Sequence, residues 1–220
     1  CVGGSSFSNT LANGGTATAI FDGAVTVNNL GTLGGNTAYT CDCNAALTIA
    51  SGGTVSFPNA SGTCTIQGNY DCDGTQTANS GTVSFDGATT AGIDAVGTGN
   101  LNNVVIAVPG SNYKEIQTAS PTFDGTFTVN ASARLYVDTA LNLTITGATS
   151  ITGTLANTSN SATFTFNGAV TINSGGVFDE ANSIAWTCDC NANLTIASGG
   201  TMRAPNASGT FTLSGNLSQS

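Results

Sequence analysis

The sequence predicts an all-β fold: a single parallel β-solenoid over residues 1–220, with about ten coils of roughly 21 residues and no helical caps. Three observations predict it. Apolar and polar residues alternate in many short segments, these segments recur at a regular spacing, and glycine-rich phrases separate them. Alternation with a period of two is typical of strands, and a repeat of 20–50 residues is typical of stacked-coil proteins.

The strand-like segments each centre on a small residue, and most steps between centres are 19 to 24 residues. The long step from Gly87 to Gly125 fits two coils if LNNVVIAV around Val105 supplies the missing strand. An antiparallel sandwich is the alternative, but it would not predict like residues at the same position of every repeat. The segment centres are Gly23, Ala45, Gly68, Gly87, Gly125, Gly147, Gly168, Ala192 and Gly215.

Alternate residues of a strand point to opposite sides, so the alignment sorts the side chains into inward and outward columns. Phrases such as SGG and NSGG supply the corners between strands. One predicted inward column holds Ala19, Cys41, Cys64, Val83, Leu143, Phe164, Cys188 and Phe211. The other holds Phe21, Cys43, Ile66, Phe85, Phe123, Ile145, Phe166, Cys190 and Leu213.

The chain contains an internal duplication, since residues 16–69 resemble residues 161–216. The offset between the two blocks is 145 to 147 residues, which corresponds to about seven coils. Two similar blocks therefore present the same surface chemistry twice along one rod.

Composition excludes several function classes. Charged residues make up 7% of the chain, the net charge is −9, and there is no histidine. A nucleic-acid partner would require a basic face, and no apolar run is long enough for a transmembrane helix. Acid–base catalysis has few candidate groups, so we expect no enzyme activity and no cofactor. The chain has the composition of a secreted, extracellular or cell-surface protein.

Seven cysteines include two C-x-C pairs in TCDC phrases at residues 40–43 and 187–190. The pairs lie too far apart for one metal site, and their ladder neighbours are apolar, so no metal is expected. Cys41 and Cys64 occupy one inward column on adjacent coils, which permits a disulfide. A Cys43–Cys72 bridge would need a corner that brings two walls together. The alternative for all of them is a small buried hydrophobe.

The second C-x-C has no partner cysteine on adjacent coils, and Cys1 is also alone. An odd cysteine in a secreted protein suggests intermolecular pairing, here between Cys1 of one subunit and Cys188 or Cys190 of the next. The alternative is that Cys1 is a lipid-modified or unpaired terminal residue.

The ends of the predicted rod lack capping signals, which a solenoid needs in solution. Residues 1–15 are predicted to complete a coil of a neighbouring subunit. Head-to-tail stacking of this type does not close and produces a filament or sheath, although a fragment of a longer repetitive chain would show the same ends. The apolar residues expected at the stacking ends are Phe7, Phe211, Leu213 and Leu217.

Outward threonines predict a second function. Pairs of threonines at alternate positions form a flat hydroxyl array, which resembles in part the surface of ice-binding β-solenoids; threonine is also simply a good solvent-facing strand residue. The alternative function is therefore binding of glycans or ice through this face, and N-x-S/T triplets such as those at Asn59 and Asn130 allow glycans as a surface modification. The predicted threonine face consists of Thr63, Thr65, Thr163, Thr165, Thr210 and Thr212.

The phrases SGTVSFDGATTAGIDAVGTGNLNNVVIA and SATFTFNGAVTINSGGVF resemble the Gly/Thr/Asn-rich repeats of bacterial and archaeal surface proteins of the β-solenoid adhesin or filament type. The resemblance covers nearly the whole chain. It implies an extracellular, fibrous or adhesive role, and it names no ligand and no catalytic residue. Our expectation is a structural protein that assembles with copies of itself; the alternative is an adhesin segment.

Overall fold

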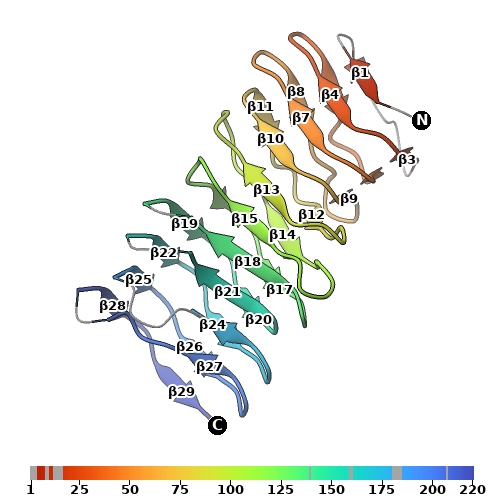
Figure 1. Cartoon of the computed structure of the whole chain (residues 1–220). Coiled ribbons are helices and arrows are strands. Elements are labelled where there is room, and N and C mark those ends of the chain that lie inside the picture. The colour runs from red at the N-terminus through yellow and green to blue at the C-terminus, as the bar shows by residue number, and fades with distance from the viewer. Residues whose placement is uncertain are drawn as a thin grey trace.

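The computed structural model describes residues 4–7, 10–11, 17–138, 140–158, 161–179, 185–206 and 208–220, with only the backbone of Phe7 and Thr10. Every regular element in these ranges is a β-strand. The strands stack into an elongated rod with the two ends of the chain at opposite ends of the stack (Figure 1). All strand pairs are parallel, which confirms the predicted parallel β-solenoid.

The rod has three walls, which the chain visits in a fixed order. Wall 1 contains β3 (Thr18–Phe21), β6 (Thr40–Cys43), β9 (Thr63–Ile66), β12 (Thr82–Phe85), β14 (Asn103–Ile106), β17 (Phe127–Val129), β20 (Thr149–Ile151), β23 (Val170–Ile172), β26 (Leu194–Ile196) and β29 (Leu217–Gln219). Wall 2 contains β1 (Ser5–Phe7), β4 (Val25–Val27), β7 (Leu47–Ile49), β10 (Tyr70–Cys72), β13 (Ala91–Asp94), β15 (Lys114–Ile116), β18 (Arg134–Val137), β21 (Thr154–Asn157), β24 (Val177–Phe178) and β27 (Thr201–Met202).

Wall 3 consists of two sheets. The first contains β2 (Thr10–Leu11), β5 (Thr32–Gly34), β8 (Thr54–Ser56) and β11 (Thr75–Thr77). The second contains β16 (Thr122–Phe123), β19 (Asn142–Ile145), β22 (Thr163–Phe166), β25 (Thr187–Cys190) and β28 (Thr210–Leu213). Both sheets follow wall 2 and precede the next strand of wall 1, so they line the same side of the rod. Isolated bridges from Thr75 to Thr98 and from Leu101 to Phe123 lie where one sheet gives way to the other.

The length of a turn agrees with the prediction. Nine steps between paired strands of wall 1 carry the chain from Ala19 to Leu217, which gives about 22 residues per turn. The segment around Val105 supplies the missing strand as expected, because β14 pairs with β12 in wall 1.

The structure corrects the predicted columns, because they join strands from two walls. Cys64 and Val83 lie on wall 1, whereas Phe164 and Cys188 lie on wall 3. Between Gly87 and Gly125 the chain passes from the end of wall 1 to the end of wall 3, so the long step covers about one and two-thirds turns rather than two. Every later repeat is therefore displaced by one wall.

The cause is a repeating unit that is shorter than a turn. A four-residue strand, a three-residue corner and a three-residue strand form this unit, as in β6–β7 and β25–β26. The first of these joins wall 1 to wall 2, and the second joins wall 3 to wall 1. The duplicated blocks thus lie six turns and two walls apart. They present similar strands on different sides of the rod, at an offset close to the expected seven turns.

The inward side chains form a continuous apolar core along the axis. Above and below Cys188 and Cys190 lie the residues that the sequence predicts, with Phe164 and Phe166 on one side and Phe211 and Leu213 on the other. An aromatic cluster fills this part of the core: the centroid of the Phe178 ring lies 5.3 Å from that of Phe164 and 5.2 Å from that of Trp186, at interplanar angles of 87° and 69°. Such edge-to-face pairs add to the gain from burial.

Gly99 provides a test of the change of sheet in wall 3. Its φ is +100°, and an added Cβ would lie 1.9 Å from the Gln76 carbonyl oxygen on the previous turn. We expect Gly99→Ala to lower the free energy of unfolding by more than the ~1–3 kcal/mol of a strained backbone. Urea denaturation followed by circular dichroism measures it.

The matched control is Gly110→Ala, which has a similar left-handed φ of +74° but no atom within 4 Å of the added Cβ. Gly110→Ala carries the backbone cost without the steric contact. Its free energy of unfolding should therefore fall less than that of Gly99→Ala. If the free energy of unfolding falls equally in the two variants, the close approach between turns at Gly99 does not contribute to the need for glycine there.

Candidate functional site

The predicted threonine face is divided between two walls. Thr63 and Thr65 lie on β9 of wall 1, whereas the other four lie on β22 and β28 of wall 3: Thr163, Thr165, Thr210 and Thr212. On wall 3 the register places Thr165, Asp189 and Thr212 in one outward line, so a carboxylate interrupts the array. The six threonines therefore do not form one continuous surface.

The cysteines are buried as the apolar interpretation requires. Cys41, Cys43, Cys64, Cys72, Cys188 and Cys190 all carry free thiols. Cys41 and Cys64 are register partners on adjacent turns, as predicted, and the disulfide between them stays a prediction. Cys43 lies on wall 1 and Cys72 on wall 2 of the next turn. Cys1 lies outside the described residues.

Each C-x-C pair places two thiols side by side inside the rod. The sulfur atoms are 3.7 Å apart for Cys41 and Cys43 and 3.6 Å apart for Cys188 and Cys190. The hydrogen bond with Cys190, followed by burial, raises the pKa of Cys188. Because β28 covers the second pair, a cysteine from another subunit would reach it only if the last turn opened. That intersubunit bond stays a prediction.

Acidic residues lie close together on the outer side of wall 2. Asp71 and Asp94 are register partners on adjacent turns. Burial, followed by the charges of Asp73 and Asp94, raises the pKa of Asp71. Among the described residues, no group of three His, Cys, Asp or Glu side chains is placed to hold a metal ion.

The regular repeat is interrupted in the middle of the rod, at the corner between walls 1 and 2. Residues 86–90 connect β12 to β13, and residues 107–113 connect β14 to β15, where earlier turns use three residues. Two surface pockets lie along this corner of the rod, and each includes residues of the 107–113 segment. One of about 280 Å³ is lined by Gln67, Asp86, Gly87, Ala88, Ala107 and Pro109. The other, of about 390 Å³, is lined by Gly110, Ser132, Arg134, Thr152, Gly153, Thr154 and Gly175.

Two tyrosines lie beside the larger pocket, on the outer side of wall 2. Tyr113 precedes β15, and Tyr136 alternates in β18 with the buried residues Leu135 and Val137. Both tyrosines are half-buried, and their rings meet edge to face with centroids 5.0 Å apart. Arg134 donates from Nη1 to the Tyr136 hydroxyl at 3.5 Å. We call Tyr113, Tyr136, Arg134 and the larger pocket the mid-rod site.

A buried lysine lies beneath the same corner. Lys114 replaces an apolar residue in an inward column, between Ala91 and Leu135. Its side chain is fully buried, and Nζ donates to the carbonyl oxygens of Gln67 at 2.5 Å and Gly68 at 3.4 Å, two turns away. Burial lowers the pKa of Lys114 to about 8, and the nearby Asp86 carboxylate partly opposes this shift. The lysine therefore joins the turn with the 107–113 corner to the regular corner at residues 67–69, across the turn that carries the 86–90 corner.

Sequence reasoning missed the mid-rod site, although the chain contained a signal for it. The strands NYKEI and ARLYV bring together the lysine, one of two arginines and two of four tyrosines within 25 residues. Most of the other strands combine threonine or serine with apolar residues and carry no cationic side chain. A local departure from an otherwise uniform repeat is the place to expect a function.

The buried lysine predicts an unusual dependence of stability on pH. The native pKa of about 8 lies below 10.5, the ordinary lysine value. Between these values the unfolded chain holds a proton that the native chain has released, so the contribution of Lys114 to the free energy of unfolding should rise with pH, by at most about 1.4 kcal/mol per pH unit. Buried thiols whose pKa is raised, such as Cys64 and Cys188, act in the opposite direction in this range, because the unfolded chain ionises them first. Denaturant unfolding at pH 7 to 10.5 measures it.

In Lys114→Met this contribution should disappear, so the free energy of unfolding should rise less, or fall more, from pH 8 to 10.5 than in the unmodified chain. Arg203→Met is the control, because it makes the same loss of a cationic side chain at an exposed position. If the free energy of unfolding depends on pH in the same way in Lys114→Met and in the unmodified chain, the pH dependence belongs to other groups.

Comparison with known proteins yields little. The chain matches no known protein family and no curated protein. One solved structure that matches is the crystal structure of a TibC-catalysed hyper-glycosylated TibA fragment, with 14% identity, 99% of this chain and 97% of that chain covered, and a TM-score of 0.22. The two chains do not superpose closely, so no property of that fragment is transferred. Within the described residues, no helix long and apolar enough to cross a membrane is present.

Proposed function

We propose that this protein is a non-enzymatic rod exposed outside the cell, of the adhesin type, which binds saccharides at the mid-rod site. The edge-to-face pair of Tyr113 and Tyr136 carries the proposal. Aromatic rings that are half exposed offer an apolar face and a polar hydroxyl at low entropic cost. The C–H face of a sugar ring can pack on such a surface while its hydroxyls bond to neighbouring polar groups.

The groups around the tyrosines suit a polyhydroxylated ligand. Glu115 accepts a hydrogen bond from the Gln117 amide at 3.0 Å on the strand next to Tyr136, and both side chains are accessible. Thr152 and Ser132 line the pocket beside Arg134. Binding sites for small polar molecules combine a shaped recess with a few such donors and acceptors.

The surrounding scaffold supports a passive, extended role. Its outer surfaces are mostly Thr, Ser, Asn and Gly, and only 7% of the residues are charged. Solvation by hydroxyls and amides suits a rod that projects from a surface. On this proposal the threonine lines of walls 1 and 3 solvate the rod and bind nothing.

The test measures binding of the purified chain to a glycan array and the effect of Tyr136→Ala on each glycan bound. Loss of a stacked ring should weaken binding at least about tenfold, equivalent to ~1.4 kcal/mol. Tyr136→Phe keeps the ring and should retain most of the affinity. Thr128→Ala, on the outer side of wall 1, is the matched surface control.

Binding that survives Tyr136→Ala but fails in variants of the wall 3 threonines would move the site to the threonine array. No binding to any glycan would contradict the proposal.

A second candidate function, end-to-end self-assembly, is favoured by the C-terminal turn. In each wall the last strand, β27, β28 or β29, pairs on one side only within the described residues. Leu217 is 59% exposed, and Phe211 and Leu213 are only partly buried. Another copy that stacks on this face would continue the ladders and cover these side chains.

Electron microscopy of the purified chain tests this candidate. Filaments should show an axial repeat of about 50 Å, from ten turns at ~4.8 Å each. Leu217→Asp should disperse the filaments, because it places a charge in the stacking face. Ser220→Asp adds the same charge at residue 220 and is the control, for which more filaments should remain. Imaging of the Cys1→Ser variant shows whether a disulfide from Cys1 contributes to filament formation. Dispersed rods of the unmodified chain would contradict self-assembly, and turns of a longer chain would then cover this face.

A further inference from the structure

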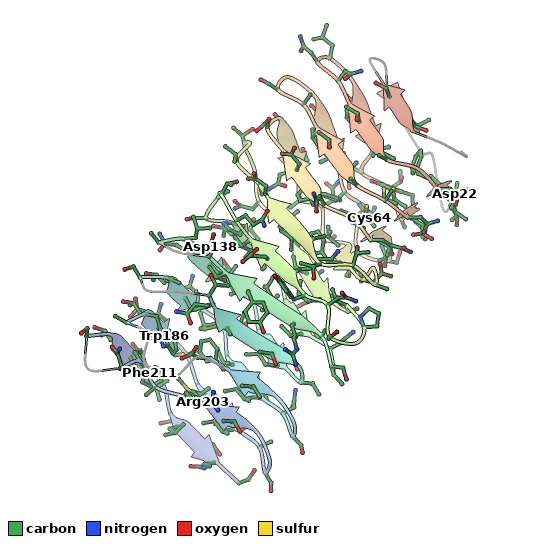
Figure 2. All side chains as sticks on the ribbon, viewed as in Figure 1. Asp22, Cys64, Asp138, Trp186, Arg203 and Phe211 are labelled. Carbon is green, nitrogen blue, oxygen red and sulfur yellow. The ribbon has the colours of Figure 1, made fainter. Side chains whose placement is uncertain are left out.

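We infer that the saccharide bound at the mid-rod site is acidic, with its carboxylate held by Arg134 in the larger corner pocket. This inference rests on the proposed saccharide binding and adds the class of ligand. The chain carries three cationic side chains, and Lys114 is fully buried in the core. Arg203 lies after β27, three turns from Tyr136 and four from Tyr113 in the stack of wall 2, toward the C-terminal end of the rod (Figure 2). Arg134 is therefore the cation at this part of the surface.

The pocket around Arg134 has the shape and chemistry for a small anionic group. It is a recess of about 390 Å³, lined by Arg134, three hydroxyl residues and three glycines. Gly110 and Gly175 both have left-handed φ and open space where a Cβ would stand. Their lack of side chains keeps the rim of the pocket open. A guanidinium can donate two parallel hydrogen bonds to a carboxylate, and hydroxyls complete its solvation.

Arg134 and the tyrosine pair lie close enough to contact one ligand. Arg134 and Tyr136 are two residues apart on the same side of β18, and the guanidinium reaches the Tyr136 hydroxyl. Tyr136 in turn contacts Tyr113 on the adjacent turn. A pyranose ring that stacks on the tyrosines would thus have Arg134 at one edge. The span of about two strand residues, ~6.6 Å, is comparable with a single sugar unit.

Nearby acids set the orientation of this ligand. Glu115 is the register partner of Tyr136, and Asp138 lies at the far end of β18, where it accepts a hydrogen bond from Thr158. Four residues separate Asp138 from Arg134, or ~13 Å along a strand. The cation therefore lies at the corner between walls 1 and 2, and the carboxylates lie toward wall 3. An acidic sugar would place its carboxylate at the corner and its hydroxyls toward Glu115 and Asp138.

The experiment compares matched pairs of glycans that differ only in charge. Suitable probes are oligogalacturonides and their methyl esters, and sialyllactose and lactose, with dissociation constants measured by calorimetry. We expect the unmodified chain to bind the acidic member at least about tenfold more tightly, as a charge-assisted hydrogen bond predicts. Arg134→Gln should remove this preference but retain binding to the neutral member. Arg203→Gln, the matched control, should leave the preference unchanged.

The outcomes separate this inference from the proposed function. Equal affinity for both members of every pair would overturn the acidic ligand and leave saccharide binding intact. No binding to either member of any pair would overturn both. A preference that persists in folded Arg134→Gln would assign the carboxylate to another group and overturn the role of Arg134. If that variant does not fold, the matched pairs are measured on the unmodified chain and on Arg134→Lys. Lysine keeps the charge and loses the two parallel hydrogen bonds, so the preference for the acidic member should decrease; an unchanged preference would overturn the role of Arg134.

Discussion

Parallel backbone pairing between successive turns is the constraint on which this molecule depends. Each turn must present its N–H and C=O groups to the next at ~4.8 Å, and side chains have to fit within that spacing. Small residues follow from it at the corners, where an added Cβ at Gly147 would lie 2.3 Å from the Gly125 carbonyl oxygen. Inside, Ile106, Val129 and Ile151 share one line, because residues of similar size stack without gaps.

The same constraint explains why the fold was predictable from sequence and the placement of residues was not. A ladder requires like residues at a fixed spacing, so strand segments such as TCDC and TFTF identify inward and outward positions. Nothing in those segments states on which wall they lie. That depends on corner length, which changes at residues 86–90 and 107–113. Cys188 was therefore assigned the correct neighbours, Phe164 and Phe211, but the wrong column.

The candidate site could not be predicted for a related reason. Sequence reasoning treated each residue as a member of a repeat, whereas the mid-rod site consists of the residues that break the repeat. Lys114 occupies an inward position that a pattern would assign to an apolar residue. Only the structure shows that small Ala91 below it leaves room for the stem, and that carbonyl groups two turns away accept its hydrogen bonds.

The interruption and the site are therefore best explained together. Burying a lysine lowers the free energy of unfolding, and longer corners cost conformational entropy that three-residue corners avoid. Two such costs in one place indicate that the local arrangement serves another purpose. The 107–113 corner and Lys114 lie directly beside Tyr113, which contacts Tyr136 on the next turn, and the same corner supplies Pro109 and Gly110 to the two pockets. A rod selected for stiffness alone would have continued its regular unit through these turns. Selection for a recess flanked by aromatic rings accounts for the departure and for the residues that make it.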